Sequence, residues 1–273
     1  IENFCFDAIR NNEKYKVKNF TGKFHYSKQE IRINNLNMKT DDSTLNGHFL
    51  LTYKEPKDLS DFNNKVYWDV FFDRGSVINF KDIRYFTPLF DKNSSASVFG
   101  KVTGTLNNLT FSNFEIFGGE NYIGANQLNL ADMMNGTLKI RSNNAKLTSS
   151  YQRLTKLLPT FVSKKIPFFI ERFGNMNYRG NIMLDPTDIS IDGYAITALG
   201  DADIRAKLRN YKNPKSMIYA GTLDAKNINL RQITDVKDLG FVSGKMKFNG
   251  VGTDISKMNL DLDGSLRYID LLG

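Results

Sequence analysis

Apolar and polar residues alternate with a period of two along most of the chain. Clear runs occupy residues 45–53, 66–72, 98–106 and 258–268, where every second position is apolar or glycine. Successive side chains of a strand point to opposite faces, so this pattern predicts strands with one apolar and one polar face. Clusters of Asn, Asp, Ser and Lys between the runs, such as 41–44, 107–108 and 142–144, are typical of turns. The sequence therefore predicts an all-β chain of mainly antiparallel strands.

A five-residue unit recurs, in which one glycine stands between two apolar residues of the same strand face. The glycines of this unit are Gly22, Gly47, Gly104, Gly180, Gly221, Gly244 and Gly264. A glycine inside a strand weakens it and usually marks a bend, a bulge or the close approach of another group. Chance placement of glycines is the alternative explanation. The common phase favours an apolar face that is bent at intervals.

Three segments break the alternation. Residues 80–86 and 230–239 have helical spacing, and Gly240 ends the second of these segments. The longest, 149–174, has a helical apolar period and is split by Pro159 and Pro167. We therefore divide the chain into a first β segment, 1–148, this helical segment, and a second β segment, 175–273, within one continuous architecture.

The segment 149–174 has two interpretations. It is densely apolar around residues 166–170 and carries Lys164, Lys165 and Arg172 beside them. An amphipathic segment of this kind can touch lipid headgroups, and these three cations are then the candidate contacts. The simpler interpretation, which we favour, is a helical cap over the open apolar edge of the sheets.

Composition and charge narrow the class of protein only slightly. The 273 residues include 21 Phe and 12 Tyr, enough apolar area to form a core, and no apolar run reaches the length of a membrane-spanning helix. The net charge of +8 is dispersed and contains no basic block, so we expect no nucleic-acid partner. The chain begins at Ile1 and stops within a strand-like run, which we interpret as an internal fragment of a longer protein.

Residues for catalysis or metal binding are sparse. The two histidines, His25 and His48, alternate with apolar-face residues and so point to the polar side, which disfavours a histidine triad or a zinc site. Residues 259–264 with Asp270 approach the pattern of a calcium loop, but the alternation there fits a strand better. We therefore expect no enzyme activity, no cofactor and no metal.

The glycine-punctuated strands resemble the AsmA-like and TamB family of bacterial envelope proteins. The resemblance rests on residues 238–250 (DLGFVSGKMKFNG), on 40–47 (TDDSTLNG) and on the proline-split segment from Leu157 to Gly174. It implies a periplasmic, elongated antiparallel sheet folded into a U-shaped apolar trough that carries phospholipid acyl chains between the inner and outer membranes and supports outer-membrane assembly. Some family members act with an outer-membrane barrel protein and are tethered by an inner-membrane anchor, both of which lie outside this chain.

Phase along the strands gives the candidate lipid-groove residues. They are Phe24, Phe49, Leu51, Val102, Leu106, Ile182, Leu184, Leu223, Met246 and Phe248. A long contiguous apolar surface on a protein usually has a use, and acyl chains could replace water there. One alternative is a scaffold or adhesive β-repeat protein in which the same residues form a closed, dry core. A second is a carbohydrate-active β enzyme, for which the sequence offers carboxylates but no identifiable pair.

Overall fold

The computed structural model describes residues 1–10, 13–86, 94–164, 166, 168–234, 236–252 and 257–271. Strands account for 66% and helices for 14%, which confirms the predicted all-β fold of antiparallel strands. The chain divides into two compact units, one of residues 1–138 with 152–166 and one of residues 139–151 with 167–273. The segment 149–174 therefore contributes to both units.

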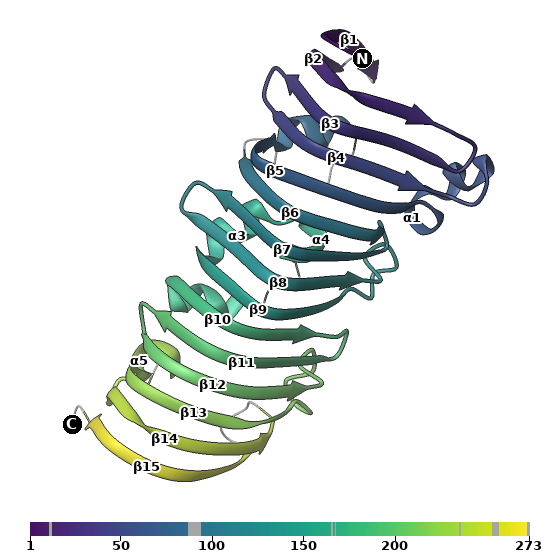
Figure 1. Ribbon diagram of the computed structural model, residues 1–273. Helices are drawn as coiled ribbons and strands as arrows, with labels where there is room; N and C mark the ends of the chain where they lie inside the picture. The colour runs from purple at the N-terminus through teal and green to yellow at the C-terminus, as the bar shows by residue number, and fades with distance from the viewer. Residues whose placement is uncertain are drawn as a thin grey trace. The chain divides into compact units, whose positions relative to one another are not determined.

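The first unit is an open antiparallel sheet whose strands follow the order of the sequence (Figure 1). Its elements are β1 (Phe4–Arg10), β2 (Glu13–Tyr26), β3 (Glu30–Thr40), β4 (Thr44–Thr52), η1 (Pro56–Asp61), α1 (Phe62–Lys65), β5 (Tyr67–Asn79), α2 (Phe80–Phe86), β6 (Ser95–Thr105), β7 (Asn108–Gly118), β8 (Asn121–Ala131), most of α3 (Tyr151–Leu157), and α4 (Thr160–Ser163).

The second unit repeats this plan. Its elements are β9 (Lys139–Ser150), η2 (Phe168–Phe173), β10 (Asn175–Leu184), β11 (Asp188–Thr197), β12 (Gly200–Arg209), β13 (Ile218–Asn229), α5 (Leu230–Thr234), β14 (Leu239–Val251) and β15 (Asn259–Leu271). Each strand pairs antiparallel with the next one in the sequence.

Asparagines in the left-handed region shift the alternation inside several strands. Asn35, Asn113, Asn144 and Asn227 have φ between 46° and 53°, and the strand register shifts beside each of them. Asn adopts this conformation more easily than most residues, and an extra residue in one strand forms a bulge. The prediction of a turn at residues 142–144 was therefore wrong, because these residues form a bulge within β9.

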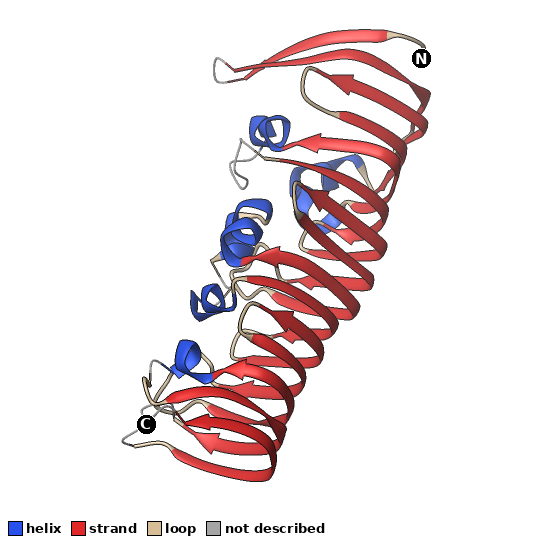
Figure 2. Ribbon diagram, turned by 90° about the vertical axis from the view of Figure 1, so that its left-hand side faces the viewer, coloured by secondary structure: helices blue, strands red, loops and turns tan. Residues whose placement is uncertain are grey.

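Helices form in all three predicted segments. The helix expected over residues 80–86 is α2. The helix expected over 230–239 is only α5, which ends at Thr234. The prediction that Gly240 ends this helix was wrong, because Leu239 and Gly240 begin β14. α3 ends at Leu157, and α4 begins after Pro159, which fits the splitting effect of proline. Figure 2 shows these helices as short turns beside the sheets. Among the described residues, no helix combines the length and apolar character needed to cross a membrane.

Candidate functional site

The apolar face of the first sheet is built from rows that cross the strands at right angles. Directly paired residues lie on the same face, so the strand registers define each row. One row contains Phe24, Ile33, Phe49, Val70, Val102, Phe111 and Leu128, one residue from each of β2 to β8. The next row contains Tyr26, Ile31, Leu51, Trp68, Gly104, Leu109 and Leu130. We call this surface the first apolar face.

Four of the five candidate residues of the first unit lie in these two rows, but their exposure differs. Phe24 is 49% exposed, whereas Val102 is only 5% exposed. Phe49 and Leu51 are half-buried, and the Phe49 ring makes an edge contact with Phe72 at 5.5 Å between ring centroids. Phe24 therefore offers more surface to a ligand than Val102.

Leu106 is not a strand residue. β6 ends at Thr105 and β7 begins at Asn108, so Leu106 lies in the turn between them. Its expected place on the apolar face followed from continuing the alternation one position too far.

The second sheet carries an equivalent surface, the second apolar face. One row contains Ser142, Ile182, Ile191, Ala206, Gly221, Phe248 and Leu262. A second contains Ala145, Gly180, Gly193, Ile204, Leu223, Met246 and Gly264, and a third contains Ile140, Leu184, Ile189, Leu208, Tyr219, Gly250 and Leu260. The five candidate residues of this unit all lie in these rows. In β15, Leu262 is 62% exposed and Leu266 is 57% exposed.

The opposite face of each sheet is charged. In the first unit, Lys101 pairs with Asp69 at 3.1 Å. In the second, Arg205 pairs with Asp192 at 3.0 Å, and the Arg267 guanidinium beside Asp224 holds the pKa of that carboxyl below its usual value. Acidic and basic side chains thus stay on one side of each sheet, and the apolar rows stay on the other.

The histidines also belong to the polar faces. His25 pairs with Arg32 across β2 and β3, and its Nε2 lies 3.5 Å from the Glu30 carboxylate. The alternation pattern did not reveal this carboxylate partner. Residues 259–264 lie in β15, with Asp261 and Asp263 exposed, as the strand interpretation predicts.

Aromatic rings cover several glycines of the second apolar face. A Cβ placed on Gly180 would lie 2.6 Å from the Tyr178 phenol oxygen, and one on Gly193 would lie 2.8 Å from it. The Tyr178 hydroxyl donates to the Asn181 and Asp192 carbonyls at 2.8 and 3.2 Å. Among the glycines of the five-residue repeat, Gly180 thus leaves room for the Tyr178 ring. A Cβ on Gly47, Gly104, Gly244 or Gly264 would instead meet the backbone of the paired strand.

The same arrangement recurs elsewhere on the second apolar face. The Tyr219 ring covers Gly250, and the Phe248 ring covers Gly221. Burial raises the pKa of Tyr178 to about 12, because a phenolate would lose its hydration there. These rings fill the second apolar face where the glycines would otherwise leave gaps.

Short helices cover the ends of the apolar faces. In the first unit, Phe80 of α2 and Leu157 of α3 pack with Ala96 of β6, against Ile78 and Ile116. In the second, Leu230 and Ile233 of α5 pack on the cluster of Ala225, Ile228 and Val242. Each face is therefore closed by a helix near one end of its strands.

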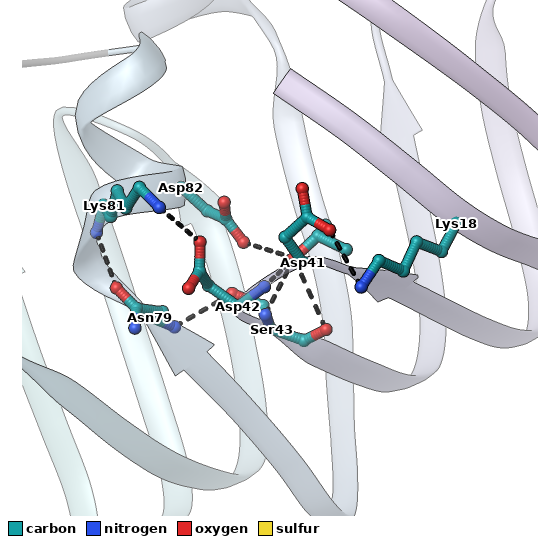
Figure 3. A network of polar contacts seen from close by, with 8 residues as sticks. Lys18, Asp41, Asp42, Ser43, Asn79, Lys81 and Asp82 are labelled. Atoms are coloured by element: carbon teal, nitrogen blue, oxygen red, sulfur yellow. Dashed lines mark hydrogen bonds and ion pairs between the residues drawn. The ribbon is translucent and has the colours of Figure 1, made fainter. Parts of the chain in front are cut away.

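A polar network fastens α2 to the turn between β3 and β4 (Figure 3). The Thr40 hydroxyl donates to the Asp82 carboxylate of α2 at 2.6 Å and accepts the backbone N–H groups of Asp42 and Ser43. Lys81 of α2 pairs with Asp42 at 2.8 Å, which raises the pKa of Lys81. These polar contacts hold α2 in place beside the apolar face.

The residues proposed as headgroup contacts are divided between the units. Lys164 is exposed and follows α4, in the first unit. Arg172 belongs to the second unit and donates to the Ile233 carbonyl at 2.9 Å, next to the end of α5. Lys165 lies outside the described residues. A contact between Arg172 and a headgroup would therefore compete with a bond inside the protein.

Comparison with known proteins identified no relative of this chain. The chain matches no described protein family, no curated protein and no solved structure.

Proposed function

We propose that the apolar faces of this chain bind the acyl chains of phospholipids, within a periplasmic AsmA-like or TamB-like protein that carries lipid between the inner and outer membranes. The observation that supports this most is the registered apolar rows, which include large exposed side chains such as Phe24 and Leu262, opposite a charged face. Apolar rows that leave large side chains open to water often mark a surface that meets a partner.

The free energy of acyl-chain binding favours lipid transport over high-affinity binding. Each methylene removed from water contributes about 0.8 kcal/mol, so one acyl chain gains ample free energy on such a face relative to water. Relative to a bilayer the gain is near zero, because lipid tails are as apolar as leucine side chains. A lipid on these rows could therefore enter and leave a membrane without a large barrier from a specific polar contact.

The alternative function is a scaffold or adhesive protein whose apolar residues form a dry core. The burial of Val70 and Val102, at 0% and 5% exposed, favours it. The two functions differ in what fills the space above the apolar rows, and lipid content separates them.

The test replaces one residue of each apolar face by aspartate. The Phe49→Asp, Leu223→Asp double variant places a carboxylate in both faces, and Leu50→Asp with Thr222→Asp is the matched control on the polar faces. After exposure to phospholipid vesicles, extracted lipid per chain should fall at least fivefold in the first variant and stay within about twofold in the control, because an unpaired carboxylate against acyl chains is costly.

Far-UV circular dichroism must show folded protein in both variants for the comparison to count. Wild-type protein that takes up no lipid, or equal lipid in both double variants, would contradict lipid binding and favour the dry core. If Phe49→Asp with Leu223→Asp fails to fold, the milder Phe49→Ser with Leu223→Ser is measured in the same way.

A further inference from the structure

A small pocket of about 260 Å³ lies in the first unit, where α3 meets the turn between β7 and β8. Its lining residues are Ser94, Ser95, Gly118, Gly119, Asn121, Arg153, Lys156 and Leu157. We call it the rim pocket, because it borders the helix-covered end of the first apolar face. Its lining comes from three separate parts of the chain, so the sequence pattern did not reveal it.

One side of the rim pocket is apolar and belongs to the first apolar face. Leu157 lines the pocket and is also part of the buried cluster with Phe80 and Ala96. A Cβ on Gly118 would lie 2.8 Å from the Leu157 Cδ1, so this side chain packs directly on the glycine backbone. A molecule in the pocket would therefore have apolar protein beside it.

The other side is cationic and rich in hydrogen-bond donors. Arg153 and Lys156 stand three residues apart on α3, which places them on the same side of the helix. The hydroxyls of Ser94 and Ser95 add two neutral donors. Cations with hydroxyl groups are the usual partners of a phosphate, and a guanidinium can bind two phosphate oxygens at once.

One carboxylate limits this positive charge. Glu120, in the turn between β7 and β8, forms an ion pair with Arg153, and the Glu120 side chain is 80% exposed. Such an exposed pair is weak. An anion in the pocket would compete with Glu120 for Arg153. Removing the Glu120 charge should therefore strengthen the binding of an anion.

We propose that the rim pocket binds the phosphate of a phospholipid headgroup, through Arg153 and Lys156, beside the helix-covered end of the first apolar face. This assignment rests on the proposed lipid binding and adds a place for the headgroup. It differs from the sequence-based expectation, which put headgroups at residues 164, 165 and 172.

The test compares two lipids that share acyl chains but differ in the phosphate. Phosphatidylglycerol and diacylglycerol with identical chains are titrated into the full chain, and affinities are read from a fluorescent acyl probe that they displace. The Arg153→Gln, Lys156→Gln variant should bind phosphatidylglycerol about tenfold more weakly, because two exposed ion pairs together are worth on the order of 1.4 kcal/mol. Its affinity for diacylglycerol should not change.

Two further variants sharpen the result. Glu120→Gln removes the competing carboxylate and should strengthen phosphatidylglycerol binding about threefold, without an effect on diacylglycerol. Lys164→Gln removes a positive charge that is close in sequence but does not line the pocket. It should change the affinity for neither phosphatidylglycerol nor diacylglycerol. If Arg153 has only a structural role, Glu120→Gln should instead weaken the binding of both phosphatidylglycerol and diacylglycerol, because the variant loses the ion pair.

The outcomes separate this site from the proposed function. If both lipids bind equally and the variants change nothing, the rim pocket is refuted while lipid binding stands. If neither lipid binds, both are refuted. Glycerol phosphate and inorganic phosphate are titrated in parallel, and binding of these alone, with the same dependence on Arg153 and Lys156, would replace the lipid headgroup with a soluble phosphate.

Discussion

The glycine beneath the Tyr178 ring gives the sharpest test of how the apolar faces are built. We consider Gly180→Ala, which adds one methyl group to the second apolar face. The new Cβ would overlap the Asp192 carbonyl oxygen and would lie 2.5 Å from the Gly193 Cα, so the paired strands have to separate. It would also displace the phenol of Tyr178, which lies 2.6 Å away from that position.

The expected loss of stability follows from these contacts. Overpacking by one methyl group costs about 1–3 kcal/mol. The phenol has one proton, which the Asn181 and Asp192 carbonyls share, so loss of this hydrogen bond costs about 1 kcal/mol more. Alanine restricts the unfolded chain more than glycine, which offsets about 0.4–1 kcal/mol of this loss. The net destabilisation should be about 2 kcal/mol.

The control is Gly252→Ala in the same unit. Gly252 has φ of +79°, but the nearest atom to a Cβ there is 3.4 Å away, so only backbone strain of about 1–2 kcal/mol is expected. Urea unfolding followed by far-UV circular dichroism gives both values. A loss for Gly180→Ala no larger than that for Gly252→Ala would refute the close packing of ring, glycine and neighbouring strand.

Two further predictions concern other parts of the two units. The raised pKa of Tyr178 means that its neutral phenol stabilises the fold fully below pH 10, and that this contribution, about 2–3 kcal/mol, is lost as the pH rises from 10 towards 12. The urea midpoint should therefore fall more steeply over that range in wild type than in Tyr178→Phe, and parallel curves would exclude this role. Thr40→Val should destabilise the first unit by about 2–3 kcal/mol, because it leaves the Asp82 carboxylate and two amides without their partner. Asp82→Asn keeps an acceptor and should cost less than 1 kcal/mol in the same urea measurement, so equal losses in the two variants would contradict the network.

Much of the fold could be predicted from the sequence, because the preferences of neighbouring residues determine where strands and helices form. The alternation of apolar and polar residues identifies the strands, and Pro159 separates α3 from α4 as expected of a residue without a backbone N–H. The five candidate residues of the second unit lie on one apolar face because they keep the same phase in long, regular runs.

What the pattern missed depends on pairing between strands. A left-handed asparagine such as Asn35 reverses the alternation, so Ile33 and Leu36 lie on the same face although three positions separate them. Only the register with β4 reveals this. Alternation alone also does not show where a strand ends, so Leu106 was expected in a strand run and lies in the turn after β6.

The geometry of one row shows why an apolar face suits a moving acyl chain. Seven strands at a spacing of about 4.8 Å give a row about 29 Å long, close to the 30 Å hydrocarbon core of a bilayer. Along the row from Phe24 to Leu128 each paired residue is apolar, so a chain lying on it meets no polar step. A chain that moved along the polar face would pass charged side chains such as the pair of Lys101 with Asp69. A single aspartate at Phe49 interrupts the apolar row near its middle, which is why that position, more than the turn residue Leu106, decides between a path for lipid and a dry core.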